Sequence, residues 1–96
     1  MADFIFLTHT DAGDEGDWGG YIQRLNAAGV FRGGSAMGDG VCVKKVGAAP
    51  AITAHLGGYI RIEADDLAHA QHFVIGHPAY EAGGTVEIRE LPRTDD

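Results

Sequence analysis

The sequence predicts an α+β fold in which one antiparallel sheet carries two helices on a single face. Three observations predict it: an apolar run near the start, two stretches with helical spacing of apolar residues, and two late stretches that alternate apolar with polar residues. Because 45% of the 96 residues are hydrophobic, we expect a single domain over residues 1–96 with its own core. Only the end, from about residue 93 to residue 96, is typical of a loose tail.

The first two elements are a strand and a helix. The run Phe4 to Leu7 is apolar at every position, which predicts a central strand with both faces covered. An acidic, glycine-containing loop follows, and Asp17 at its end is expected to cap a helix. The apolar residues of this amphipathic helix recur at three- and four-residue steps: Trp18, Tyr21, Ile22 and Leu25. Gly29 is placed to end the helix.

The middle of the chain predicts an inserted hairpin arm. Two short β-type runs, Val30 to Ala36 and Val41 to Val46, are separated by the turn residues Gly38-Asp39-Gly40. Residues 47–53, which include Pro50, predict a loop before the next strand.

The second half repeats the order strand, helix, strand. Residues Tyr59 to Glu63 alternate strictly, so this strand has one buried and one polar face. Asp65 is expected to cap a second helix, which Gly76 and the nearby Pro78 end. The apolar side of that helix consists of Leu67, Ala70, Phe73 and Val74. Residues Thr85 to Arg89 alternate again and predict the last strand.

This order is the ferredoxin-like βαββαβ arrangement, with the hairpin arm inserted. The alternation directs Ile60, Ile62, Val86 and Ile88 toward the helices. It directs Tyr59, Arg61, Glu63, Glu87 and Arg89 to the opposite face. A monomer would leave this opposite face open, although the first strand is apolar on both sides. We therefore expect a homodimer in which two sheets face each other, a dimeric α+β barrel.

Composition excludes several classes of function. The formal net charge of −7 argues against nucleic-acid binding, because phosphate backbones would be repelled. No apolar run approaches the roughly 20 residues that cross a bilayer, so no membrane partner is expected. The start of the chain lacks the pattern of a signal peptide, and the single Cys42 cannot form an internal disulfide. These features predict a cytoplasmic protein.

Three histidines are candidates for general acid–base catalysis, because His titrates near neutral pH. His9 ends the first strand, His55 precedes the third and His77 adjoins Pro78. Strand ends and a helix terminus converge in a ferredoxin-like protomer, so the three are expected near one pocket with Ser35 and Tyr80. The alternatives are that His77 bonds the last carbonyls of its helix and that His9 lies in a loop.

Other patterns predict no metal and no cofactor. His69 and His72 lie three residues apart but on the polar side of the helix, and no third ligand is suitably spaced. The acids Asp11, Asp14, Glu15 and Asp17 miss the calcium-loop spacing and are interpreted as a solvated loop with a helix cap. The Gly-rich residues 33–38 lack the nucleotide-binding fingerprints. Cys42 is interpreted as a packed structural thiol within its strand.

Several short pieces of the chain form a set with a definite order and spacing. In the second half these are Gly57 to Ile60, Glu63 to Leu67, His77-Pro78 and Gly83 to Arg89. In the first half they are Trp18, Leu25, Gly29 and Gly33-Gly34. Together these pieces resemble the YCII-related family, also called the DGPF-domain family. The resemblance implies a dimeric α+β barrel of ferredoxin-like protomers, and it implies little about a reaction.

Two departures from the family pattern bear on function. Residues 48–52 read Ala-Ala-Pro-Ala-Ile where relatives have an Asp-Gly-Pro-Phe stretch, so only the proline remains. Some relatives pair a His on the first helix with an Asp before the proline that ends the second helix. The matching positions here are Trp18 and His77. Trp cannot shuttle a proton, so the resemblance does not carry that dyad over.

Two hypotheses about function follow. The first is a homodimer that binds a small organic ligand in the cleft between its sheets, with weak acid–base catalysis. Tyr59, Arg61 and Arg89 would supply polar contacts there, and Trp18 either walls the pocket or belongs to the core or dimer contact. The second is a non-enzymatic dimeric interaction or regulatory module. By resemblance alone, such a module is linked to transcription sigma factors.

Overall fold

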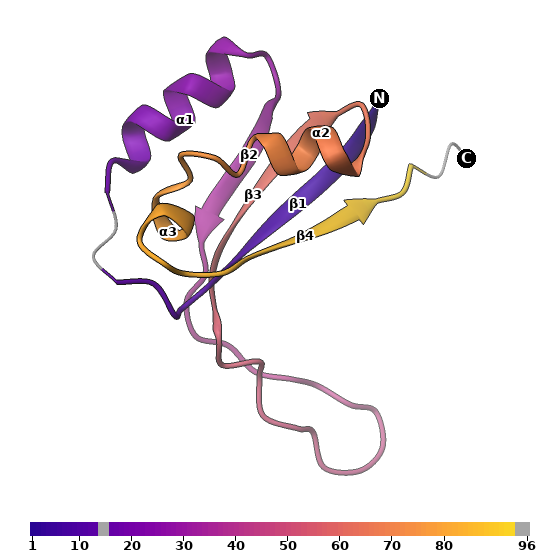
Figure 1. Cartoon of the computed structure of the whole chain (residues 1–96). Helices are drawn as coiled ribbons and strands as arrows, with labels where there is room; N and C mark the ends of the chain where they lie inside the picture. The colour runs from indigo at the N-terminus through magenta and orange to yellow at the C-terminus, as the bar shows by residue number, and fades with distance from the viewer. Residues whose placement is uncertain (14–15, 94–96) are drawn as a thin grey trace.

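The structure, a computed structural model, describes residues 1–13 and 16–93. Its elements follow the order β1, α1, β2, β3, α2, α3, β4 (Figure 1). Their bounds are β1 Ala2–His9, α1 Trp18–Ala27, β2 Phe31–Ala36, β3 Leu56–Ala64, α2 Leu67–His72, α3 Pro78–Glu81 and β4 Val86–Leu91. The predicted α+β, ferredoxin-like fold class is confirmed.

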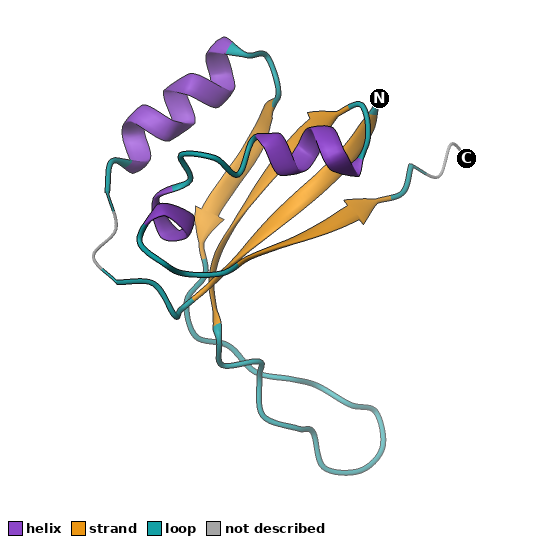
Figure 2. Ribbon diagram, viewed as in Figure 1, coloured by secondary structure: helices purple, strands orange, loops and turns teal. Residues whose placement is uncertain are grey.

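The four strands form one antiparallel sheet in the order β2-β3-β1-β4, so β1 is a central strand as predicted. Its register places Phe6 opposite Ile60 on one side and Ile88 on the other. These residues pack in the core, on the side of the sheet where Figure 2 shows the helices. Because side chains alternate along a strand, the intervening residues belong to the opposite face. The sequence alternation therefore assigned the two faces of the sheet correctly.

The core lies between the sheet and the helices. Phe4, Phe6 and Ile62 are at most 2% exposed. They pack with Tyr21 and Leu25 of α1 and with residues of β3 and α2, namely Ile60, Ala64 and Ala70. None of the helices in residues 1–13 and 16–93 has the length and apolarity that a membrane span requires.

The signals that begin and end α1 act as predicted. Asp17 is the N-cap, and its carboxylate accepts a hydrogen bond from the Gly20 backbone N–H at 2.9 Å. Gly29 follows the helix with a φ of 76°, a left-handed conformation that glycine adopts without a steric penalty.

The second helical region differs from its prediction. The N-cap of α2 is Asp66, whose carboxylate accepts the His69 backbone N–H, whereas the prediction named Asp65. The prediction placed Leu67 on the apolar side of the helix, but it is 52% exposed and is not part of the buried side. Pro78 does not end this helix but begins α3, because proline needs no N–H donor in a first helical turn.

The predicted strand at Val41 to Val46 is wrong. Residues 37–55, which we call the arm, contain no helix or strand and project away from the rest of the chain (Figure 2). Val41 and Val43 are 82% and 86% exposed. Their side chains favour a strand only where it can pair with another strand and pack on an apolar layer, and neither is present at the arm. Cys42 consequently lies in irregular chain, half-buried, with its Sγ 3.6 Å from the Ala51 carbonyl.

The placement of the core predicts a difference between two substitutions of similar size. Ile62→Ala should lower the free energy of unfolding by about 2–5 kcal/mol, because it leaves a cavity in the fully buried layer. The matched control Leu67→Ala removes a half-exposed side chain and should change it by less than about 1 kcal/mol. Urea denaturation followed by circular dichroism measures both, and equal losses would contradict this core.

Candidate functional site

A cavity of about 630 Å³ opens between α1 and the arm end of the sheet, within the size range of small-molecule sites. Trp18 and Ile22 of α1 form one wall, and β1, β2 and β3 contribute the others. The remaining residues lining it are Thr8, His9, Thr10, Ala12, Phe31, Gly34, Ser35, Ala36, Gly57, Gly58, Tyr59 and Ile60.

Gly34, one of the lining residues, lies where β2 approaches β3 closely. Gly34 has no side chain, and a Cβ built there would lie 2.7 Å from the Tyr59 carbonyl oxygen, too close for any other residue. Close approach of β2 to β3 therefore requires glycine at this position. The aromatic ring of Trp18 stands across the cavity from these strands, half-buried. The result is an apolar chamber with polar groups from β1 at one end.

The polar end contains an oriented histidine. His9 Nε2 lies 3.0 Å from Glu87 Oε1, and Arg89 contacts the other carboxylate oxygen at 3.3 Å. The hydrogen bond from His9, followed by that from Arg89, holds the pKa of Glu87 below its ordinary value. An ionised Glu87 accepts the Nε2 proton, which leaves a lone pair on Nδ1 of neutral His9. A histidine held in one tautomer by a carboxylate is a general-base arrangement.

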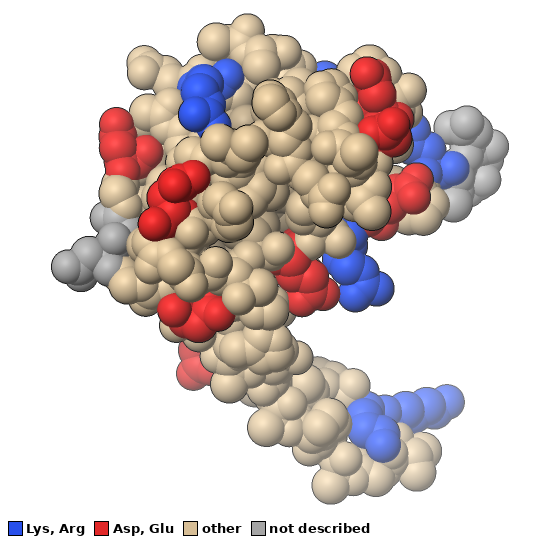
Figure 3. All heavy atoms as spheres, viewed as in Figure 1, with Lys and Arg blue, Asp and Glu red and all other residues tan. Residues whose placement is uncertain are grey.

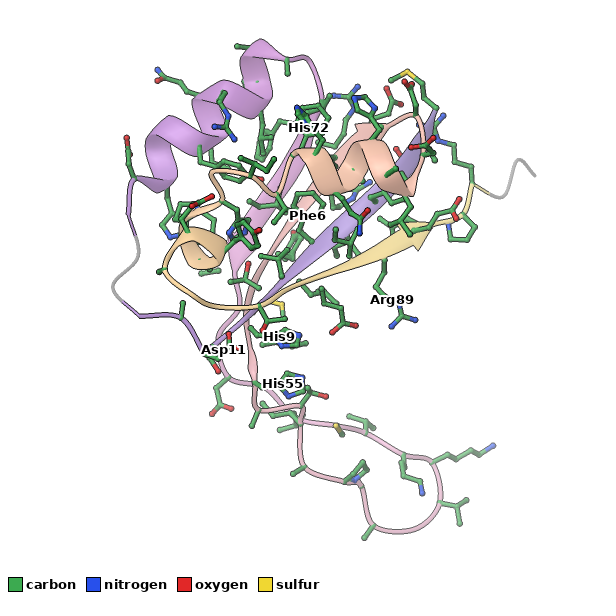
Figure 4. The ribbon with its side chains drawn as sticks, in the orientation of Figure 1. Phe6, His9, Asp11, His55, His72 and Arg89 are labelled. Atoms are coloured by element: carbon green, nitrogen blue, oxygen red, sulfur yellow. The ribbon has the colours of Figure 1, made fainter. Side chains whose placement is uncertain are left out.

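His55 lies beside His9 where the arm returns to the sheet (Figure 4). The two ring centroids are 4.8 Å apart in an edge-to-face contact. The Thr10 N–H donates to the His55 carbonyl at 2.9 Å, which fixes the return of the chain next to β1. The predicted convergence of His9 and His55 is thus seen, although His55 does not line the cavity itself.

His77 has a different environment from the other two. It is fully buried, and it is the N-cap of α3 rather than the end of α2 as predicted. Its Nδ1 accepts the Ala79 backbone N–H at 3.2 Å, and its Nε2 lies 3.4 Å from Thr8 Oγ1. The ring also packs edge-on against Trp18, with centroids 4.8 Å apart. These contacts tie α3, β1 and α1 together behind the cavity wall.

The other predicted ligand contacts lie in three places. Ser35 and Tyr59 line the cavity together with Trp18. Arg61 and Arg89 lie on the sheet face opposite the helices, where their register places them on either side of Ile5. Tyr80 is 48% exposed and borders a separate, smaller hollow near α2. His69 accepts the Asp65 backbone N–H, and no cluster of three possible metal ligands occurs in the described chain.

Sequence reasoning missed a tether beside the cavity. The Asp11 carboxylate accepts hydrogen bonds from the Thr85 N–H at 2.8 Å and the Thr85 hydroxyl at 2.7 Å. These bonds hold the pKa of Asp11 below its ordinary value. The residues around Asp11 do not indicate a hydrogen-bond partner 74 residues away. The sequence therefore predicted only a solvated loop at Asp11. Asp14 and Glu15, predicted with it, lie outside the described residues.

Charged residues share the sheet face opposite the helices, which we call the open face. Its members are Asp3, Ile5, Leu7 and His9 of β1, Arg32 and Ser35 of β2, Tyr59, Arg61 and Glu63 of β3, and Glu87, Arg89 and Leu91 of β4. Arg93 pairs there with both Asp3, at 2.8 Å, and Glu63. Arg93 is therefore anchored, which corrects its assignment to a loose tail; residues 94–96 lie outside the described chain.

Comparison with known proteins gives a family. The YCII-related domain model matches residues 10–94, nearly the whole chain. The chain belongs to the YCII-related family. No curated protein and no solved structure gives a significant match. The family assignment fits the fold, and the two positions that correspond to the proposed dyad of some relatives, Trp18 and His77, are indeed in ring contact. In this member that contact is aromatic packing.

The coupling of His9 to Glu87 can be measured. His9→Ala should raise the pKa of Glu87 toward its ordinary value, because the largest cause of its depression is removed. The lowered pKa also affects folding. Ionised Glu87 stabilises the fold at a pH above its ordinary pKa, and this contribution is lost as the pH falls through its pKa in the folded protein. Carboxyl ¹³C NMR titration measures the shift.

The matched control is His72→Ala, which removes an exposed histidine of α2 on the far side of the sheet. It should leave the Glu87 titration unchanged. An unchanged Glu87 pKa in His9→Ala would show that the two side chains do not interact in solution.

Proposed function

We propose that this YCII-related protein is a homodimer that binds a small organic molecule in the cavity behind Trp18, with His9 as its acid–base group. The observation that carries the proposal is the arrangement of the cavity. An apolar chamber of about 630 Å³ ends at a histidine that a carboxylate orients at 3.0 Å. A chamber that served only packing would not need an oriented, titratable group at its mouth.

The lining defines the chemical class of the ligand. Trp18, Ile22 and Phe31 favour a flat, apolar body, because aromatic and aliphatic walls gain most from burying such surface. Among the polar residues of the lining, Thr8 has its side chain on the helix side of the sheet, where it adds a neutral hydrogen-bonding group. Among the described residues, no Lys or Arg lines the cavity. We therefore expect an uncharged aromatic or cyclic molecule that places an acidic hydrogen near His9.

The proton transfer follows from the tautomer. Nδ1 of neutral His9 accepts a proton from the ligand, and the negative Glu87 stabilises the imidazolium that forms. The same proton returns from Nδ1 to the ligand at a different atom or on release, so the residue ends unchanged. This chemistry is proton exchange or tautomerisation of the ligand, and it needs no cofactor.

The homodimer is proposed from the open face. All three helices lie on the other side of the sheet, so Ile5 and Leu7 in the middle of β1 have no covering layer within the described chain. The face mixes acids with arginines, so a second copy related by a twofold axis can match unlike charges. A 96-residue domain gains much from such cover, because small domains bury a smaller share of their surface.

A second candidate function is a non-enzymatic interaction module without a small ligand. The exposed valines of the arm favour it, because such residues suit a protein partner better than solvent. Under this candidate the cavity stays empty of any specific ligand, and the two functions are separated by ligand binding.

Trp18 is the only tryptophan in the chain, so its fluorescence reports directly on the cavity. The uncharged probe N-phenyl-1-naphthylamine should accept energy from Trp18 when it binds in the apolar chamber. Ala36→Phe places a ring in the chamber and should weaken this binding at least tenfold. The matched control Ala48→Phe adds the same ring to the exposed arm and should leave it unchanged.

Equal binding by the wild type and both variants would place the probe elsewhere and overturn the cavity as the site. For molecules that a fluorescence screen then identifies, exchange of the acidic hydrogen with D₂O should be faster with the wild type than with His9→Gln. Equal exchange rates would remove the acid–base role and leave binding alone.

A further inference from the structure

The arm is held apart from its own protomer. The radius of gyration is 14.9 Å, whereas a compact chain of this length has about 12.5 Å. Figure 1 accounts for the excess: the arm extends beyond the ends of β2 and β3 as a long loop. Its backbone returns to the sheet only near its two ends, where Met37 N–H bonds the Gly57 carbonyl and Thr10 N–H bonds the His55 carbonyl.

The arm exposes apolar side chains in unusual density. Val41, Val43 and Val46 are 82%, 86% and 78% exposed, and they lie within six consecutive residues. Single exposed apolar residues are ordinary on protein surfaces, but a contiguous group on a projecting segment is typical of an interaction site.

The charge of the arm differs from that of the rest of the chain. Asp39 against Lys44 and Lys45 gives the arm a net charge of +1. The rest of residues 1–13 and 16–93 holds nine acids against five arginines, a net charge of −4. Both lysines lie among the exposed valines. A second copy of this chain is therefore net acidic outside its own arm and attracts the basic arm, whereas two arms would repel each other.

The direction of the arm relates it to the open face. Figure 4 shows His9, His55 and Arg89 on the side of the sheet from which the arm extends, away from the helices. In the space-filling view, the body and the arm enclose a notch (Figure 3). A second copy that covers the open face would lie in this notch and would meet the arm.

We propose that each arm clasps the second copy of the homodimer, burying Val41, Val43 and Val46 against it while Lys44 and Lys45 face its acidic groups. This inference rests on the proposed homodimer and adds the arm as the main contact that holds its two copies together. It also explains why a stretch with β propensity is irregular and exposed in one protomer: its packing surface belongs to the other. Since Gly57 and the residues around His55 join the arm to the cavity rim, the clasp also fixes the mouth of the cavity.

The test compares two aspartate substitutions within the arm. Val43→Asp should raise the dimer dissociation constant at least tenfold, measured by sedimentation velocity over a dilution series. The matched control Ala48→Asp adds the same charge to the same exposed segment outside the valine group, and it should dissociate like the wild type. Circular dichroism and Trp18 fluorescence check that each variant is folded. Val43→Ser, which adds no charge, replaces Val43→Asp if that variant fails to fold.

The outcomes separate this proposal from the one it rests on. Weakening by Val43→Asp alone supports the clasp. A wild-type dimer that both variants leave unchanged overturns the clasp but keeps the open-face dimer. A wild-type monomer at every concentration overturns both. Spin labels on Cys42, the single cysteine, give an independent readout: one narrow label-to-label distance in the dimer supports a docked arm, and a broad distribution contradicts it.

Discussion

The two-sidedness of β1 is the constraint on which the rest of the structure depends. Phe4 and Phe6 fill the core beneath the helices, while Ile5 and Leu7 emerge between charged neighbours on the open face. A strand that is apolar on both sides needs two layers of cover, and the described chain supplies one. The proposed homodimer and the position of His9 at the end of β1 both follow from this strand.

The same strand connects the fold to the chemistry. Thr8 points inward to the buried His77, and His9 points outward to Glu87, so adjacent residues direct the two histidines into opposite roles. His77 packs in the interior and caps α3. His9 is half-exposed, bonded to a carboxylate and among the residues that line the cavity, which is why we propose it as the acid–base group. Both residues are histidines, so their different burial, and not their residue type, separates the packing role of His77 from the proposed acid–base role of His9.

Periodicity predicted what is determined locally. The alternation of Tyr59 to Glu63 and the caps at Asp17 and Gly29 depend on near neighbours, and the structure has them as predicted. Features that depend on residues far apart in the sequence were missed or placed wrongly. The Asp11–Thr85 tether joins residues 74 apart, and the cavity is lined by residues from α1, β1, β2 and β3, which are distant in the sequence. The strand predicted at Val41 to Val46 was wrong because propensity does not reveal whether a pairing strand exists in the same protomer.

The central claim is that the open face belongs to a homodimer with a small molecule in its cavity. Native mass spectrometry of the gently purified full chain tests it most directly. We expect a dimer of about twice the 10.1 kDa protomer mass that carries the additional mass of a bound small molecule reproducibly. A dimer without added mass would contradict the ligand and favour the interaction module. A clean monomer at concentrations well above those in a cell would contradict the dimer itself.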